Sequence, residues 1–410
     1  MRPRLVRRRT AALLLVGVSV GGCQIIGSID ERVLAPATDP GTDLEAGALG
    51  TPALDAAVTC SRGLCSKTVA AGDAFTCSRE RDGRVRCWGA NDRGQLGDSS
   101  TADRKDPAYV VGVAGVTDLW AGSDFACARL SAGGASCWGT NVSGELGDPG
   151  LRAYYRARPV DVPGLDGVRE LALGAGHACA LADDAVLCWG DNGSGQCAQD
   201  ADVKCDFPRP VSGLTANVVQ IAAGGGTSCA LHGDGSVWCW GSNRAGQLAT
   251  GTRTSTPTPT RIESLAPAVR LGMFGDRVCA ALRDGTIWCW GGADDADAGP
   301  PPSPKPVASV AKAIDGVALG SEHTCALTED GVLVCWGYDG KGQLGRDRSG
   351  QGAALPVPSL AGVTAFDLGA NHTCARLAAG DLYCWGANER GQLGEGSTTD
   401  QYRPMRVLFQ

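Results

Sequence analysis

The sequence has little of what metal centres, membrane spans and nucleic-acid interfaces are built from. Only four of its 410 residues are His, 5% are aromatic, and the formal net charge is −7. An acidic chain has no electrostatic footprint for nucleic acid. The apolar run at 11–20 is shorter than the ~20 residues that cross a bilayer. We therefore expect no nucleic-acid partner, no cofactor and no bound metal.

The first 22 residues are arranged like a secretory signal peptide. Five Arg lie between residues 2 and 9, a short apolar run comes next, and Val20-Gly21-Gly22 precedes Cys23. This end resembles the lipobox of bacterial lipoproteins, which implies cleavage before Cys23 and lipid attachment to its thiol. The alternative is an ordinary cleaved signal followed by a chance Cys. The expected location is the bacterial cell envelope, with the chain lipid-anchored to the outer membrane and facing the periplasm or the cell surface.

The segment 23–57 differs in composition from the residues on its C-terminal side. It is rich in Ala, Gly, Pro, Asp and Thr and has no hydrophobic period. Such a composition cannot bury enough apolar surface to fold, so we expect a flexible tether. Residues 58–410 are left as the folded domain.

An internal repeat dominates this domain. The tripeptide Cys-Trp-Gly occurs seven times, with Trp at 88, 138, 189, 240, 290, 336 and 385. Each copy lies in a unit of about 50 residues with four short apolar segments and Gly-rich turns, and no helical period is visible. Radially repeated four-stranded sheets are propeller blades. The sequence predicts an all-β fold, a seven-bladed β-propeller of four-stranded antiparallel blades.

The two ends of the repeat array look complementary. The first unit begins at Thr68-Val69-Ala70-Ala71-Gly72 without a preceding strand, and the last ends with a strand at 403–407. We expect the C-terminal strand to join the first blade and close the ring, because closure removes exposed sheet edges.

The repeats resemble those of the regulator of chromosome condensation family, which forms seven-bladed propellers. The shared loop Gly-Gln-Leu-Gly stands at 94–97, 342–345 and 391–394, and nearly so at 144–147. The founder of that family acts on chromatin and a nuclear GTPase, which an exported acidic chain cannot meet. The resemblance therefore implies the fold and a binding role, and not the exchange activity.

Nineteen Cys in an exported chain indicate disulfides. A three-residue hairpin loop ending in a left-handed Gly places residues ten apart opposite each other. Six Cys pairs have this separation, and the third blade has nine with a turn one residue shorter. The predicted bridges are Cys77–Cys87, Cys127–Cys137, Cys179–Cys188, Cys229–Cys239, Cys279–Cys289, Cys325–Cys335 and Cys374–Cys384.

Two further pairs, Cys60–Cys65 and Cys197–Cys205, use all remaining Cys except Cys23. Zinc ligation is the competing interpretation, but this hairpin spacing is not a zinc spacing.

Other candidate metal ligands have simpler explanations. His177, His323 and His372 occupy one repeat position, where other blades have Phe, which indicates packing. Asp294, Asp295 and Asp297 replace a loop in the fifth blade and leave Ca²⁺ binding open, but their spacing fits no EF-hand.

Departures from the repeat are the best candidates for function. Tyr154, Tyr155 and Arg156 follow the second blade's third strand, and Tyr and Arg are enriched in protein interfaces. We expect a monomeric, non-catalytic, protein-binding scaffold whose partner is an envelope or extracellular protein. A glycan-binding lectin is the first alternative and a propeller hydrolase or lyase the second, although no catalytic constellation stands out.

Overall fold

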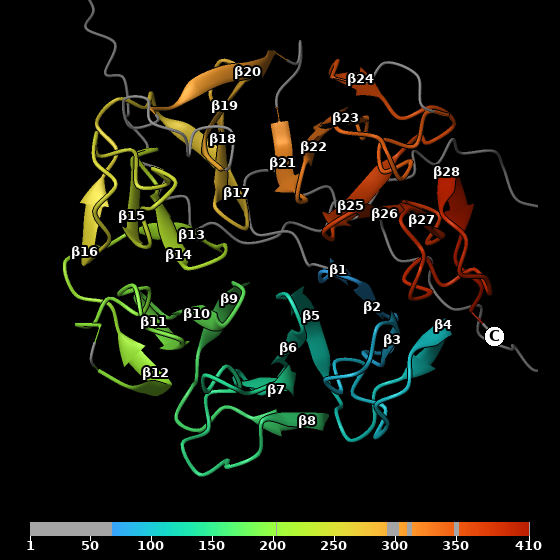
Figure 1. Cartoon of the computed structure of the whole chain (residues 1–410), viewed down its shortest axis with the longest axis horizontal. Helices are drawn as coiled ribbons and strands as arrows, with labels where there is room; N and C mark the ends of the chain where they lie inside the picture. Colours follow the sequence, from blue (N-terminus) through green and yellow to red (C-terminus); the bar gives the residue numbers. More distant parts are fainter. Residues whose placement is uncertain (1–67, 202, 293–302, 310–313, 348–351, 410) are drawn as a thin grey trace, which may run out of the picture. The chain divides into compact units, whose positions relative to one another are not determined.

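Seven four-stranded antiparallel sheets are arranged radially around a central axis (Figure 1). The computed structural model describes residues 68–201, 203–292, 303–309, 314–347 and 352–409. The compact unit that contains the propeller is Ser66–Gln410. The predicted fold class is confirmed. Within the described ranges, no helix is present that could cross a membrane.

Each blade is made of four consecutive strands. In chain order they are β1 (Val69–Ala71), β2 (Phe75–Arg79), β3 (Val85–Gly89) and β4 (Arg104–Tyr109); β5 (Val116–Ala121), β6 (Phe125–Leu130), β7 (Ala135–Thr140) and β8 (Tyr155–Asp161); β9 (Val168–Leu173), β10 (His177–Ala182), β11 (Ala185–Gly190) and β12 (Cys205–Pro210); β13 (Val218–Ala223), β14 (Thr227–His232), β15 (Val237–Gly241) and β16 (Thr256–Arg261); β17 (Ala268–Phe274), β18 (Arg277–Leu282), β19 (Thr286–Gly291) and β20 (Lys305–Ser309); β21 (Ile314–Leu319), β22 (His323–Thr328), β23 (Leu333–Gly337) and β24 (Leu355–Pro356); β25 (Val363–Leu368), β26 (His372–Leu377), β27 (Leu382–Gly386) and β28 (Gln401–Arg406).

The strands of a blade differ in burial according to their distance from the axis. The first strand of each blade lies nearest the axis and the fourth lies outermost (Figure 1). The middle strands are buried almost throughout, as in β10, while the outer β8 is exposed or half-buried along its length. Both faces of the middle strands are covered by neighbouring blades, which explains their continuous apolar runs.

The expected mode of ring closure is wrong. The C-terminal strand β28 pairs with β27 of the seventh blade, and the first blade is complete from β1 to β4. The fourth strand of every repeat follows its own Cys-Trp-Gly segment, so no strand is missing at the start. The ring closes through side-chain and backbone contacts between the seventh and first blades, which lie side by side in red and blue (Figure 1).

A tight hairpin between the second and third strands sets the register of each blade. Gly83 and its equivalents in five other blades have positive φ, and in the third blade Asp183 (φ 48°) takes this role. Each hairpin Cys pair is directly opposed in the ladder. The Cα atoms of each pair are 4.1 Å apart and the sulfurs are bonded. These seven disulfides are the seven pairs that the spacing predicts.

Candidate binding surface on the loop face

Two connections of every blade emerge at the same end of the ring. They are the turn between the first and second strands and the loop between the third and fourth, and antiparallel pairing brings them together. In the first blade the Ala90 N–H donates to the Ala74 carbonyl at 2.9 Å, joining the two connections. We call this end of the propeller the loop face.

The long loop of the loop face is held by one buried Asn. In the first blade Asn91 accepts from the Leu96 N–H at 3.0 Å and donates to the Ala102 carbonyl at 3.0 Å. Asn141, Asn192, Asn243 and Asn388 repeat the first of these bonds, and Asp339 does so in the sixth blade. The Gly-Gln-Leu-Gly segments are therefore architectural.

In six blades a tryptophan ties the blade to the loop of the preceding blade. Six indole N–H groups donate, at 2.8 to 2.9 Å, to the main-chain carbonyl at the Gln position of the preceding blade; the pairs are Trp88–Gln392, Trp138–Gln95, Trp189–Glu145, Trp240–Gln196, Trp290–Gln247 and Trp385–Gln343. The corresponding fifth-blade loop, with Asp294, Asp295 and Asp297, lies outside the described residues.

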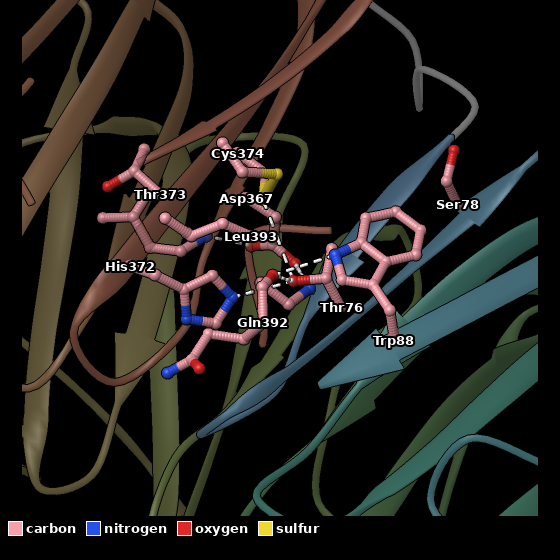
Figure 2. Close-up of a disulfide and its surroundings, with 12 residues drawn as sticks. Thr76, Ser78, Trp88, Asp367, His372, Thr373, Cys374, Gln392 and Leu393 are labelled. Carbon is pink, nitrogen blue, oxygen red and sulfur yellow. Dashed lines mark hydrogen bonds between the residues drawn. A yellow bond between two sulfur atoms is a disulfide. The ribbon is translucent and has the colours of Figure 1, made fainter. Parts of the chain in front are cut away.

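The three His hold neighbouring blades together. His372 Nε2 lies 2.9 Å from the Thr76 hydroxyl of the first blade (Figure 2), His177 Nε2 lies 2.9 Å from Ser228, and His323 Nε2 lies 3.0 Å from Thr373. Burial lowers the pKa of His177 to about 4 and the pKa of His323 and of His372 to about 3. The structure places them at three separate junctions, so they do not converge on a metal.

Charged side chains of the loop face form a second set of ties between blades. Lys341 of the sixth blade pairs with Glu389 of the seventh and lies 3.2 Å from Asp400. Arg390 of the seventh blade lies 3.3 Å from Asp92 of the first and pairs with Asp103. In both cases a cation just before the loop Gly reaches two acids of the next blade.

The first-to-second junction keeps the cation of these two junctions but lacks both acids, an interruption that lies at the second blade. Arg93 stands at the position of Lys341 and Arg390, but Val142 replaces the first acid of the next blade. The second acid of the first blade, Asp103, comes directly before Arg104, the residue that pairs with the Gly of Cys-Trp-Gly. In the second blade that Gly, Gly139, pairs with Arg156, so Tyr155 occupies the position of the second acid. Neither Val142 nor the Tyr155 ring can accept an ion pair from Arg93. Arg93 meets Asp92 of its own loop at 3.9 Å.

The predicted partner-binding residues lie beside this interruption. Tyr154 is 73% exposed and Tyr155 is 41% exposed, whereas Arg156 is half-buried within β8. The Asn141 N–H donates to the Tyr154 carbonyl at 2.7 Å, which joins the Tyr154 segment to Val142, itself 63% exposed. Sequence reasoning missed Val142 and Arg93. A valine at a loop position that holds Asp92 and Glu389 elsewhere was the available signal.

A cavity of about 270 Å³ lies among the innermost strands. Its lining includes Glu170, which accepts from the Ile221 N–H at 3.0 Å, and Asp367, which accepts from the Ala71 N–H at 3.0 Å. These carboxylates hold adjacent blades together. Burial, helped by the charge of Asp124, raises the pKa of Asp73 at this cavity to about 6. The described part of the chain contains no group of three or more His, Cys, Asp or Glu placed to hold a metal.

One predicted disulfide is absent from the described residues. Cys197 and Cys205 are both buried and both thiols. Cys197 Sγ lies 3.5 Å from the Asp191 carbonyl oxygen and Cys205 Sγ lies 3.6 Å from the Val203 carbonyl oxygen. The pair joins a loop to a strand start, so no ladder register forces the sulfurs together. Cys23, Cys60 and Cys65 lie outside the described residues.

The radial four-stranded blades, their Cys-Trp-Gly strands and their Asn-anchored loops define a repeat-built β-propeller of one class. Two models of the regulator of chromosome condensation (RCC1) repeat match the chain, one at residues 67–95, 168–196, 218–247, 314–343 and 363–392, the other at residues 82–129, 183–231, 234–282 and 379–410. Together they cover more than half of the sequence. The chain belongs to the RCC1 repeat family.

Relatives known by sequence share parts of the repeat array. The mitochondrial RCC1 domain-containing protein RUG3 of Arabidopsis thaliana is 36% identical over 94 residues, which cover 22% of this chain and 21% of that protein. The probable E3 ubiquitin-protein ligase HERC4 of Homo sapiens is 39% identical over 189 residues, covering 45% of this chain and 18% of that protein. The chain thus matches about a fifth or less of the length of these relatives.

Solved structures resemble a much larger share of the chain. Human WBSCR16 has a TM-score of 0.70 at 24% identity, covering 80% of this chain and 95% of its own. Prp20p of Saccharomyces cerevisiae, studied for its binding to Gsp1p and histones, has a TM-score of 0.69 at 21% identity, covering 85% of this chain and 88% of its own. At these identities the likeness shows the fold alone.

Proposed function

We propose that this chain is an exported lipoprotein of the bacterial cell envelope that binds a protein partner through the loop face of its first and second blades. Membership of the RCC1 repeat family supports a binding scaffold, since Prp20p is one whose binding to proteins has been studied. The arrangement of residues 1–23 supports export and a lipid on Cys23. Seven disulfides suit an oxidising compartment.

The interruption at the second blade carries this proposal. At the sixth-to-seventh and seventh-to-first junctions these two loop positions hold acids that form ion pairs between blades, and here Val142 and Tyr155 occupy them, with Tyr154 exposed beside them. Tyr and Arg are, with Trp, the residues enriched at protein-binding hot spots. Exposure of three apolar side chains at one junction has no architectural role that the other junctions require.

The charges near these residues indicate the chemistry of the partner. Arg93, Arg152 and Arg158 are exposed, and Arg152 and Arg158 lie within four residues of Tyr154 in a chain that is acidic as a whole. We infer a partner segment with an apolar or aromatic side chain flanked by Asp or Glu. Long-range repulsion by the rest of the acidic chain would keep such a segment from other surfaces.

Crosslinking in intact cells tests the binding surface. The anchored wild-type chain is compared with Tyr154→Ala and with Val142→Glu, which gives the second blade the acid found at Glu389. We expect both variants to lose the partner captured by the wild type. Tyr154→Ala removes an aromatic anchor, and Val142→Glu engages Arg93 in an ion pair within the propeller. Tyr338→Ala, at a half-exposed aromatic of the sixth blade, is the matched control and should keep the partner.

An unchanged set of captured proteins in both variants would refute the surface. Retention of the soluble chain on a glycan array, lost with Tyr154→Ala, would favour the lectin alternative instead. Lipid attachment is tested separately by incorporation of labelled palmitate, which we expect to disappear in Cys23→Ser. Incorporation that persists in that variant would contradict the anchor.

A further inference from the structure

The third blade departs from the repeat at two positions that meet in space. Cys197 stands where five other loops have a buried Leu: Leu96, Leu146, Leu248, Leu344 and Leu393. Cys205 is the first residue of β12 and pairs with Gly190. The residues paired with the equivalent Gly in other blades are Arg104, Arg156, Thr256 and Gln401.

The two thiols are buried together. Cys197 is 0% exposed and Cys205 is 1% exposed, and both belong to one cluster of buried residues. Cys197 Sγ also lies 4.0 Å from the carbonyl of Gly190, the residue opposite Cys205 in the ladder. Cys197 in place of the buried Leu and Cys205 at the start of β12 therefore place two thiols in the same buried cluster.

Neighbouring groups make the two thiols unequal. The hydrogen bond from Cys197 lowers the pKa of Cys205, and Arg209 acts in the same direction, while the shared hydrogen bond and burial raise the pKa of Cys197. The Nε of Arg209 is buried without a hydrogen-bond partner. A thiolate on Cys205 is thus favoured over one on Cys197, which is the asymmetry that thiol exchange uses.

We propose that Cys197 and Cys205 are a reversible dithiol–disulfide site, distinct from the seven structural bridges and independent of the proposed partner surface. The oxidant is a disulfide, either a small one or that of an oxidoreductase. Cys205 thiolate attacks one of its sulfurs, forming a mixed disulfide and releasing the first thiolate. Cys197 then loses its proton and attacks the Cys205 sulfur, releasing the second. The net change is two protein thiols and one disulfide giving one protein disulfide and two thiols.

The site is built into a junction between blades. The carbonyl of Gln196, the residue before Cys197, accepts from Trp240 at 2.9 Å and from Ser228 at 3.0 Å, both in the fourth blade. Asn192 holds the same loop through the Cys197 N–H and the carbonyls of Asp200 and Val203. A bond between Cys197 and Cys205 would fix this loop at both ends and slow the opening of the third-to-fourth junction.

Differential alkylation across glutathione redox buffers tests the proposal on the full folded chain. Thiols are blocked with iodoacetamide, bridges are reduced and labelled with N-ethylmaleimide, and each Cys is identified by peptide mass. We expect Cys197 and Cys205 to change label together over a range in which all seven hairpin pairs stay oxidised. Oxidation should slow hydrogen exchange in the 192–205 loop by about tenfold.

Cys197→Leu/Cys205→Thr is the matched variant, because it restores the residues of the fourth-blade equivalents. It should fold, keep seven bridges and show no redox dependence of exchange. Cys205→Thr alone should leave Cys197 unable to form the intramolecular bridge. The proposal is overturned if the pair stays reduced in every buffer or if stable glutathione adducts accumulate. It is also overturned if the Cys197–Cys205 bridge is as resistant to reduction as the seven hairpin bridges.

Discussion

The junction between the seventh and first blades and the junction between the first and second are built differently from the same parts. Both have the tryptophan tie, with Trp88 donating to the Gln392 carbonyl and Trp138 to the Gln95 carbonyl. Only the first of them has the buried His372–Thr76 bond (Figure 2) and the Arg390–Asp103 ion pair.

The difference separates what the architecture requires from what it tolerates. Where His372 meets Thr76, the first-to-second junction packs Phe75 with Ala126 in one apolar cluster. The third blade likewise packs Ala178 with Phe125. A polar pair and an apolar pair are thus interchangeable at this depth, provided that both members change. The tryptophan tie is invariant at six junctions, and the outer loop face is free to vary, which is where the partner surface is proposed.

Removing the tryptophan tie should have the largest effect and should differ between the two junctions. Trp138→Phe and Trp88→Phe both lose a buried hydrogen bond and leave a small cavity, at a cost of about 2 to 4 kcal/mol. The Gln392 carbonyl keeps the Thr76 hydroxyl at 2.9 Å, whereas Ala126 offers the Gln95 carbonyl no replacement. We expect Trp138→Phe to cost about 1 kcal/mol more, measured by urea unfolding with disulfides intact. Equal losses, or a larger one for Trp88→Phe, would contradict this explanation.

The His372–Thr76 pair should make its junction sensitive to acid. The pKa of His372 is about 3 in the folded chain against an ordinary value of 6.5, so the folded state holds it neutral. Its contribution is complete above pH 6.5 and is lost as the pH falls toward 3, because the unfolded chain takes up a proton that the folded chain refuses. Between pH 6.5 and 5 this amounts to about 2 kcal/mol.

The double variant His372→Phe/Thr76→Ala copies the apolar pair of the first-to-second junction. We expect the loss of stability between pH 7.5 and 5 to shrink by about 2 kcal/mol relative to the wild type, followed by urea midpoints at each pH. His323→Phe/Thr373→Ala should give the same shrinkage at another junction. A pH profile unchanged in both variants would show that these His are not the source of acid sensitivity.

Much of this could be predicted from the sequence because the relevant rules are local. The Cys77–Cys87 spacing and the turn Gly83 fix a hairpin register without knowledge of any other blade. The burial of the Cys-Trp-Gly tryptophans follows from alternation along one strand. The His372–Thr76 bond needs two residues almost 300 positions apart, and only the closed ring shows that they meet.

The errors have equally specific causes. The fourth strand of each unit was taken to precede the next unit, so the first unit looked incomplete and β28 was assigned to the wrong blade. The pairing of Cys197 with Cys205 was inferred from counting, and counting cannot tell a bridge from two thiols in the same buried cluster. The Arg93–Val142 interruption was invisible because it requires knowing which loop of the next blade a cation reaches.

Adding or removing an ion pair of the loop face should have the smallest effect on the free energy of unfolding. Such pairs can therefore be replaced by binding residues at little cost to stability. Val142→Glu offers Arg93 the acceptor that Glu389 gives Lys341, yet an exposed pair is worth only about 0 to 1 kcal/mol and is screened by salt. We expect at most a slight gain of stability at low salt that disappears near 0.5 M NaCl, and Glu389→Val should show the opposite small change. A gain above about 1 kcal/mol would mean that the interruption has a structural cost. Such a cost, kept in the natural chain, would strengthen the argument that this surface is reserved for a partner.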